Sequence, residues 1–106
     1  MDDHAVVMVD ATGVIRFWNA GAARAFGHPP TEAIGQTLDL IVPDEFRQAH
    51  WSGFRRAMAS GQAAAEGQPG PFPVRCADRE TRPVEGRLTL LRSAHGRIVG
   101  AMVVFG

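Results

Sequence analysis

Residues 5–20 read AVVMVDATGVIRFWNA, and this stretch decides how the rest of the chain can fold. It holds two short, apolar runs rich in β-branched residues, at 5–9 and 14–18, joined by a turn-forming segment that ends in Gly13. Two such runs around a tight glycine-containing loop are typical of a β-hairpin. Asn19 then ends the strand pattern and is a favourable helix cap, so a helix should follow directly.

The region after this hairpin predicts short helices. Residues 20–26 are rich in alanine and stop at Gly27, beyond which two prolines forbid a continued helix. A brief turn capped by Thr31 fits the segment 31–34. Residues 36–42 then form a loop with several apolar anchors.

The longest predicted helix covers about residues 44–59. A proline followed by two acidic residues suits a first turn, where free amides and the helix dipole favour negative charge, and Gly61 is the expected stop. At about 100° per residue, the apolar side chains fall on one stripe with an imidazole near its middle. The stripe holds Phe46, His50, Gly53, Phe54 and Ala57, with Trp51 and Met58 at its edge and Gln48, Ser52 and Arg56 opposite.

Residues 61–71 are rich in glycine, proline, alanine and glutamine, which predicts a mobile loop with little capacity to pack. Three strands should follow, at about 72–77, 82–92 and 97–105. In the second of them apolar and polar residues alternate, so one face belongs to the core and the other to solvent.

The last strand is apolar on both faces, so its outer face needs a cover from a helix or a partner. We assign Met102 and Val104 to the face that borders the core. The outer face then carries Val99, Ala101, Val103 and Phe105. Two strands cannot stand alone, and joining them to the last three gives an α+β fold: a five-stranded antiparallel sheet with short helices and one longer helix packed on one face.

The composition excludes several classes of protein. The chain has 106 residues, which fits one domain over 1–106, and its 11 basic and 11 acidic residues give no reason to expect nucleic acid or a membrane as partner. The single cysteine, Cys76, excludes a disulfide framework and a cysteine-rich zinc site. The acidic start at Asp2 and Asp3 is unlike a signal peptide, and no apolar run approaches about 20 residues, so we expect a cytoplasmic protein.

The chain resembles the PAS domain family in four segments that follow the family's order. They are AVVMVD…GVIRFWNA at 5–20, AFG…EAIG at 25–35, LIVPD…R…H…GF at 40–54 and D…RPVE at 78–85. The resemblance covers almost the whole chain. It implies a bacterial sensory domain of a two-component or transcriptional regulator, which binds a small ligand between the long helix and the sheet and relays the signal to an output domain of a parent protein.

An alternative that the resemblance leaves open is a ligand-free dimerisation and signal-relay module, with a homodimer formed through the outer sheet face. No nucleophile, base and orienting residue occur at a recognisable spacing, and no glycine-rich phosphate loop follows a strand. We therefore expect no enzyme activity.

His50 is the most informative polar residue, because an imidazole on an apolar helix face must turn toward the sheet. It either meets a hydrogen-bond partner in a small pocket or ligates haem, as the histidine on this helix does in oxygen-sensing PAS proteins. Against haem, residues 62–70 offer no arginine as a distal partner for oxygen. A flavin is disfavoured because Cys76 lies outside the Asn-Cys-Arg motif of light-sensing members, so we read it as a small buried residue.

The aromatic residues Trp18, Phe26, Trp51 and Phe54 fit either ordinary core packing or a pocket for a planar ligand. The ligand site is expected in the cavity between the long helix and the sheet. The residues predicted to line it are His50, Phe54, Met58, Leu38, Ile41, Trp51, Leu88, Leu90 and Met102.

Overall fold

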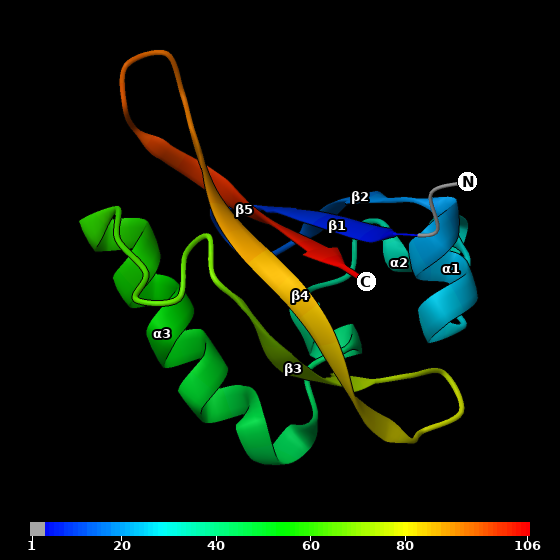
Figure 1. Ribbon diagram of the computed structural model, residues 1–106. Coiled ribbons are helices and arrows are strands. Elements are labelled where there is room, and N and C mark those ends of the chain that lie inside the picture. The colour runs from blue at the N-terminus through cyan, green and yellow to red at the C-terminus, as the bar shows by residue number, and fades with distance from the viewer. Residues whose placement is uncertain (1–3) are drawn as a thin grey trace.

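A computed structural model of the protein describes residues 4–106, so the acidic residues at the start of the chain lie outside it. Five strands form one antiparallel sheet in the order β2-β1-β5-β4-β3, with the helices on one of its faces (Figure 1). The strands are β1 (Ala5–Asp10), β2 (Ile15–Trp18), β3 (Pro69–Arg75), β4 (Thr81–Arg92) and β5 (Ile98–Phe105). The helices are α1 (Ala20–Phe26), α2 (Pro30–Ala33) and α3 (Arg47–Ser60), with 3-10 turns at Leu38–Leu40 and Asp44–Phe46. The predicted α+β architecture is confirmed.

The N-terminal hairpin is fixed by two side chains. The Asp10 carboxylate accepts hydrogen bonds from the Thr12 hydroxyl (2.6 Å), from the Val14 amide (3.1 Å) and from Arg16 Nε (2.8 Å). Asn19 caps α1, since its Oδ1 accepts from the Ala22 amide at 2.8 Å. The same oxygen accepts from the Val6 amide at 2.9 Å, so one residue ends the hairpin, starts the helix and ties the two together.

Hairpin β1–β2 joins the C-terminal half through β5, which pairs with β1 from Ala5↔Phe105 to Asp10↔Gly100. The predicted long-range pairing is therefore confirmed. Helix α2 departs from prediction in its first residue: it begins at Pro30, and its cap is Pro29 rather than Thr31. Proline suits this position because the first amides of a helix have no partner within it.

Strand β3 begins at Pro69, so the prediction of a loop over the whole of 61–71 is wrong at its C-terminal end. Pro69, Pro71 and Pro73 alternate along β3, which has a neighbouring strand on one side and lies at the edge of the sheet. Alternate residues direct their amide positions to the same side, so all three prolines can place the missing N–H on the free edge.

The two faces of β5 were assigned the wrong way round. Ala101 and Phe105 are buried, while Met102 is opposite Met8 and Thr89 on the other face. Val99 is 45% exposed and occupies a bulge, because Leu91 pairs with Gly100 and Arg92 already pairs with Ile98. An extra residue in one strand breaks strict alternation, so the sequence pattern could not carry one face assignment along the strand.

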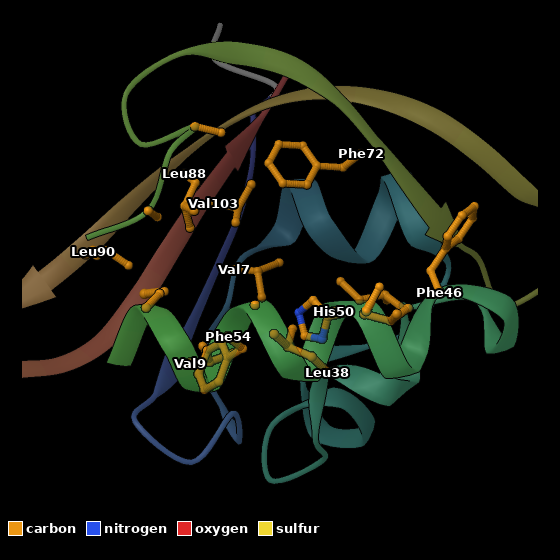
Figure 2. Close-up of a pocket in the computed structure, with 18 of the residues that line it drawn as sticks. Val7, Val9, Leu38, Phe46, His50, Phe54, Phe72, Leu88, Leu90 and Val103 are labelled. Atoms are coloured by element: carbon orange, nitrogen blue, oxygen red, sulfur yellow. The ribbon is translucent and has the colours of Figure 1, made fainter. Parts of the chain in front are cut away.

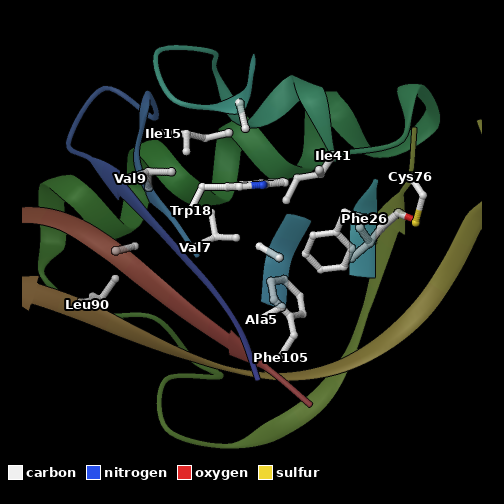
Figure 3. Packing of buried hydrophobic residues seen from close by; sticks show 14 of the residues in the cluster. Ala5, Val7, Val9, Ile15, Trp18, Phe26, Ile41, Cys76, Leu90 and Phe105 are labelled. Carbon is white, nitrogen blue, oxygen red and sulfur yellow. The ribbon is translucent and has the colours of Figure 1, made fainter. Parts of the chain in front are cut away.

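A group of buried aromatic rings lies between the sheet and α1 (Figure 3). Trp18 and Phe26 meet edge to face with ring centroids 5.8 Å apart, and Phe26 meets Phe105 at 5.1 Å. The Trp18 indole also donates to the His28 carbonyl at 2.8 Å, so its polar atom is satisfied. Trp18 and Phe26 are thus ordinary core residues.

Candidate ligand cavity

A cavity of about 660 Å³ lies between α3 and the inner face of the sheet (Figure 2). Its floor is apolar and comes from three neighbouring strands, with Val7 and Val9 on β1, Ala101, Val103 and Phe105 on β5, and Leu88 and Leu90 on β4. Leu38, Ile41 and Val42 close one side, and Phe72, Pro73 and Val74 of β3 close another. A pocket of this size and lining suits a small, mainly apolar molecule.

Helix α3 is held in place along the side that faces the segment 39–44. The Trp51 indole donates to the Asp39 carboxylate at 2.7 Å, and Arg47 donates to the Asp39 carbonyl at 3.0 Å. Arg47 and Arg75 both pair with Asp44, at 3.1 and 3.2 Å, which links the start of α3 to β3. These contacts fix the helix at a distance from the sheet that leaves the cavity open.

His50 is the polar side chain at the centre of the helix wall. Its ring contacts the Trp51 ring edge to face, with centroids 4.8 Å apart, and stacks on the Phe54 ring, with centroids 6.1 Å apart. Its Nδ1 atom is buried and has no hydrogen-bond partner among residues 4–106. Burial lowers the pKa of His50 below its ordinary value of 6.5, and the charge of Asp39 opposes that shift only in part. At neutral pH the imidazole is therefore uncharged, with one ring nitrogen unsatisfied.

The mouth of the cavity runs along the other edge of α3. Phe46, Ala49, Gly53 and Arg56 all line the cavity and are all exposed, and their spacing of three, four and three residues places them on one side of the helix. A side chain added at Gly53 would meet nothing within 4 Å. A glycine inside a helix costs about 1 kcal/mol relative to alanine. Neither its packing nor its backbone angles explain this residue, but it keeps the mouth wide.

The segment after α3 forms the end of the cavity rather than a free loop. Residues 62–65 line the cavity, and Ala63 packs against the core. Glu66 accepts the Leu90 amide at 2.8 Å and pairs with Arg92 at 3.2 Å, while the Gly67 amide donates to the Leu88 carbonyl at 2.9 Å. These bonds attach the segment to the part of β4 that lies beyond the first residue of β3. The prediction that it has little capacity to pack is wrong for this part.

Most of the predicted site residues come together. His50, Phe54, Met58, Leu38, Ile41, Leu88 and Leu90 line the cavity. Two of the predicted residues, Met102 and Trp51, lie outside the cavity lining. Met102 lies on the opposite face of β5, and the Trp51 ring packs over Gly13, with its indole nitrogen bound to Asp39.

Sequence reasoning missed Arg56, which the helical wheel places away from His50. Its long side chain nevertheless reaches the rim, because the cavity opens on that side of α3. Among residues 4–106, no three His, Cys, Asp or Glu side chains are grouped to hold a metal ion, and no helix is long and apolar enough to cross a membrane.

Comparison with known protein families agrees with the fold described above. The sequence model of the PAS fold matches residues 2–105, and the chain therefore belongs to the PAS fold family of sensory domains. Its sequence is 30% identical to the oxygen sensor protein DosP of Escherichia coli K12 over 61 residues. That match covers 58% of this chain but only 8% of DosP, so the chain corresponds to a small part of its relative.

Solved structures share the fold at low sequence identity. The PAS domain of a protein from Colwellia psychrerythraea has a TM-score of 0.82 at 20% identity, covering 99% of this chain and 86% of that one. The PAS domain of the quorum-sensing receptor RpfR from Cronobacter turicensis, solved in complex with C12:0, has a TM-score of 0.74 at 16% identity. The match covers 98% of this chain and 93% of the RpfR domain. Such identities establish the fold alone.

Proposed function

We propose that this PAS domain senses a small, mainly apolar ligand that occupies the cavity under α3 and places one hydrogen-bonding group at His50. The observation that carries the proposal is a cavity of about 660 Å³ whose wall contains a buried, unpartnered imidazole nitrogen. Leaving such an atom unpaired costs roughly 1–3 kcal/mol, so a ligand that supplies the missing bond gains affinity. DosP and RpfR support the proposal as members that sense oxygen and bind C12:0, respectively.

Signal relay in this proposal runs through β5. Phe105 lines the cavity and also contacts the rings of Phe26 and Phe72, at 5.1 and 5.7 Å. A ligand that displaces Phe105 would change the packing at the end of the last strand. An output domain of a parent protein, attached beyond this strand, would receive that change.

The direct test fills the cavity. In Gly53→Leu the added Cβ atom meets nothing within 4 Å and the rest of the side chain narrows the mouth, so the protein should remain folded while ligand uptake falls by at least about tenfold. Ser52→Leu adds the same side chain to the adjacent exposed position, which does not line the cavity, and serves as the matched control. Mass spectrometry of ligand retained by the purified proteins measures the difference. Equal retention by both variants would refute the proposal.

Haem is a second candidate occupant, favoured by the similarity to an oxygen sensor. A single axial histidine suffices to hold haem iron, and among residues 4–106 His50 is the one histidine that lines the cavity. Protein purified with haem supplied would show a strong Soret band that His50→Ala abolishes. Absence of that band would rule out haem as the occupant, and this is the outcome we expect.

A ligand-free dimerisation module is the remaining candidate, and the outer face of the sheet favours it. Phe17 is 44% exposed and pairs with Met8, which pairs with Met102, while Val6 pairs with Val104. These residues form an apolar patch across three strands that a second copy of the chain could cover. Phe17→Arg should then convert a dimer to a monomer in sedimentation analysis, whereas a monomeric unmodified protein would rule this candidate out.

A further inference from the structure

The charge around the cavity is confined to its mouth. Among residues 4–106, Arg56 is the single charged residue that lines the cavity. It also borders a shallow hollow beside the mouth, together with Gln62, Glu66 and Arg92. Two guanidinium groups and one carboxylate leave that hollow with one positive charge in excess. The cavity therefore has an uncharged interior and a cationic rim.

The two arginines of the hollow differ in what holds them. Arg92 pairs with Glu66 and donates to the Gly61 carbonyl at 3.1 Å, so its hydrogen-bonding capacity is used within the protein. Arg56 forms no ion pair within residues 4–106. A guanidinium that is free to pair is a planar fork that matches the two oxygens of a carboxylate. Arg56 is thus the rim residue available to a ligand.

We propose that the natural ligand is a single-chain carboxylic acid, with its hydrocarbon chain in the cavity and its carboxylate at the mouth against Arg56. The inference rests on the proposed function and specifies the ligand that the site selects. The chain fits because the interior offers aliphatic and aromatic side chains from α3, β4 and β5. The carboxylate fits because it remains at the exposed rim, where it does not lose its hydration completely.

His50 cannot take over the role of Arg56. The two residues are six positions apart on α3, which is about 9 Å along the helix axis. His50 is uncharged at neutral pH, because burial lowers its pKa. It can serve a polar group farther along the chain, such as a hydroxyl or a keto group, while the anionic end requires a cation at the mouth.

The test compares two probes that differ only in the head group. Dodecanoate and dodecanol, both below the concentration at which they aggregate, are titrated into the unmodified protein, Arg56→Gln and Arg55→Gln by calorimetry. Arg55 is the exposed neighbour that does not line the cavity, so its variant removes the same charge from the same helix. We expect Arg56→Gln to weaken dodecanoate binding about tenfold and to leave dodecanol unchanged. Arg55→Gln should change neither probe more than about twofold.

The outcomes separate this inference from the proposed function. If dodecanol binds as tightly as dodecanoate and Arg56→Gln has no effect, the carboxylate assignment is wrong while cavity binding stands. If Arg55→Gln weakens dodecanoate as much as Arg56→Gln, the effect is one of net charge and the assignment is also wrong. If neither probe binds the unmodified protein, or Gly53→Leu still binds both, the proposed cavity function itself fails. Binding to phosphatidylglycerol vesicles but not to the free acid would make the ligand a membrane lipid and overturn the proposal.

Discussion

The two ends of the inner sheet face are packed in opposite ways. Under α1, Trp18, Phe26 and Phe105 fill the space with edge-to-face rings, and Phe26 is 1% exposed. We call this the closed half. Under α3, the strands present smaller aliphatic side chains, and about 660 Å³ is left unfilled. We call this the cavity half. The same sheet supports both, and Phe105 borders on each of them.

We infer from this difference that the closed half supplies most of the stability, whereas the cavity half is the part that the proposed function uses. An unfilled apolar space forfeits dispersion contacts and stabilisation, so a cavity of this size is a cost to the fold. The closed half offsets that cost with aromatic packing and with Asn19, which joins α1 to β1. Three experiments test this division of roles.

The largest expected effect comes from the closed half. Phe26→Ala should lower the free energy of unfolding by about 3–5 kcal/mol, because its ring is enclosed on all sides. Phe54→Ala should cost only about 1–2 kcal/mol, because its ring is partly exposed and already borders empty space. Urea denaturation of both variants measures the contrast. Similar losses for the two would show that the cavity half is packed as tightly as the closed half.

A smaller effect of opposite sign is expected at Gly53. Gly53→Ala should stabilise the protein by about 1 kcal/mol, because alanine is the better helix former and the added methyl group meets no neighbour. Ser52→Ala, on the exposed face of the same helix, should gain no more than about 0.5 kcal/mol. Thermal unfolding of the two variants tests the comparison. A loss of stability in Gly53→Ala would mean that the mouth is not open.

The smallest expected effect is a pH dependence from His50. Since burial lowers its pKa in the folded state, the unfolded chain binds the proton more readily. The stability that depends on uncharged His50 should therefore be fully present above about pH 6.5, the ordinary pKa of histidine. It should be lost as the pH decreases from that value toward the lowered pKa of His50 in the folded state. Melting temperatures at pH 7.5 and 5.5 measure this. His50→Gln retains the other histidines, so it should show a smaller decrease, and an equal decrease would assign the effect elsewhere.

The sequence predicted the architecture because its signals were local and strong. The hairpin at 5–18, the cap at Asn19 and the long helix each follow from a few adjacent residues. The faces of β5 could not be predicted, because Val99, Ala101, Met102 and Val103 are all apolar and the bulge at Val99 interrupts the alternation. The register of β5 against its neighbours β1 and β4 decides which of its faces is buried.

The cavity was predictable in part. The stripe with His50 and Phe54 had to face the sheet, and it does. Which edge of α3 would open depended on contacts between the helix and the segment before it, namely those of Trp51 and Arg47 with Asp39, and helical periodicity does not include these contacts. For the same reason Arg56, placed on the polar side by its helical angle, became the charged residue at the mouth. Helical periodicity gives the direction of a side chain but not the location of empty space.

The pairing of Ala5 with Phe105 has a consequence for engineering. Directly opposite residues in an antiparallel pair have Cα atoms only about 5 Å apart, so a short linker could join the two ends into a closed circle. New termini could then be cut elsewhere, for example in the hairpin loop at 93–97, to give a circular permutant with the same sheet. For the same reason the domain could be spliced as a cassette into a surface loop of a host protein.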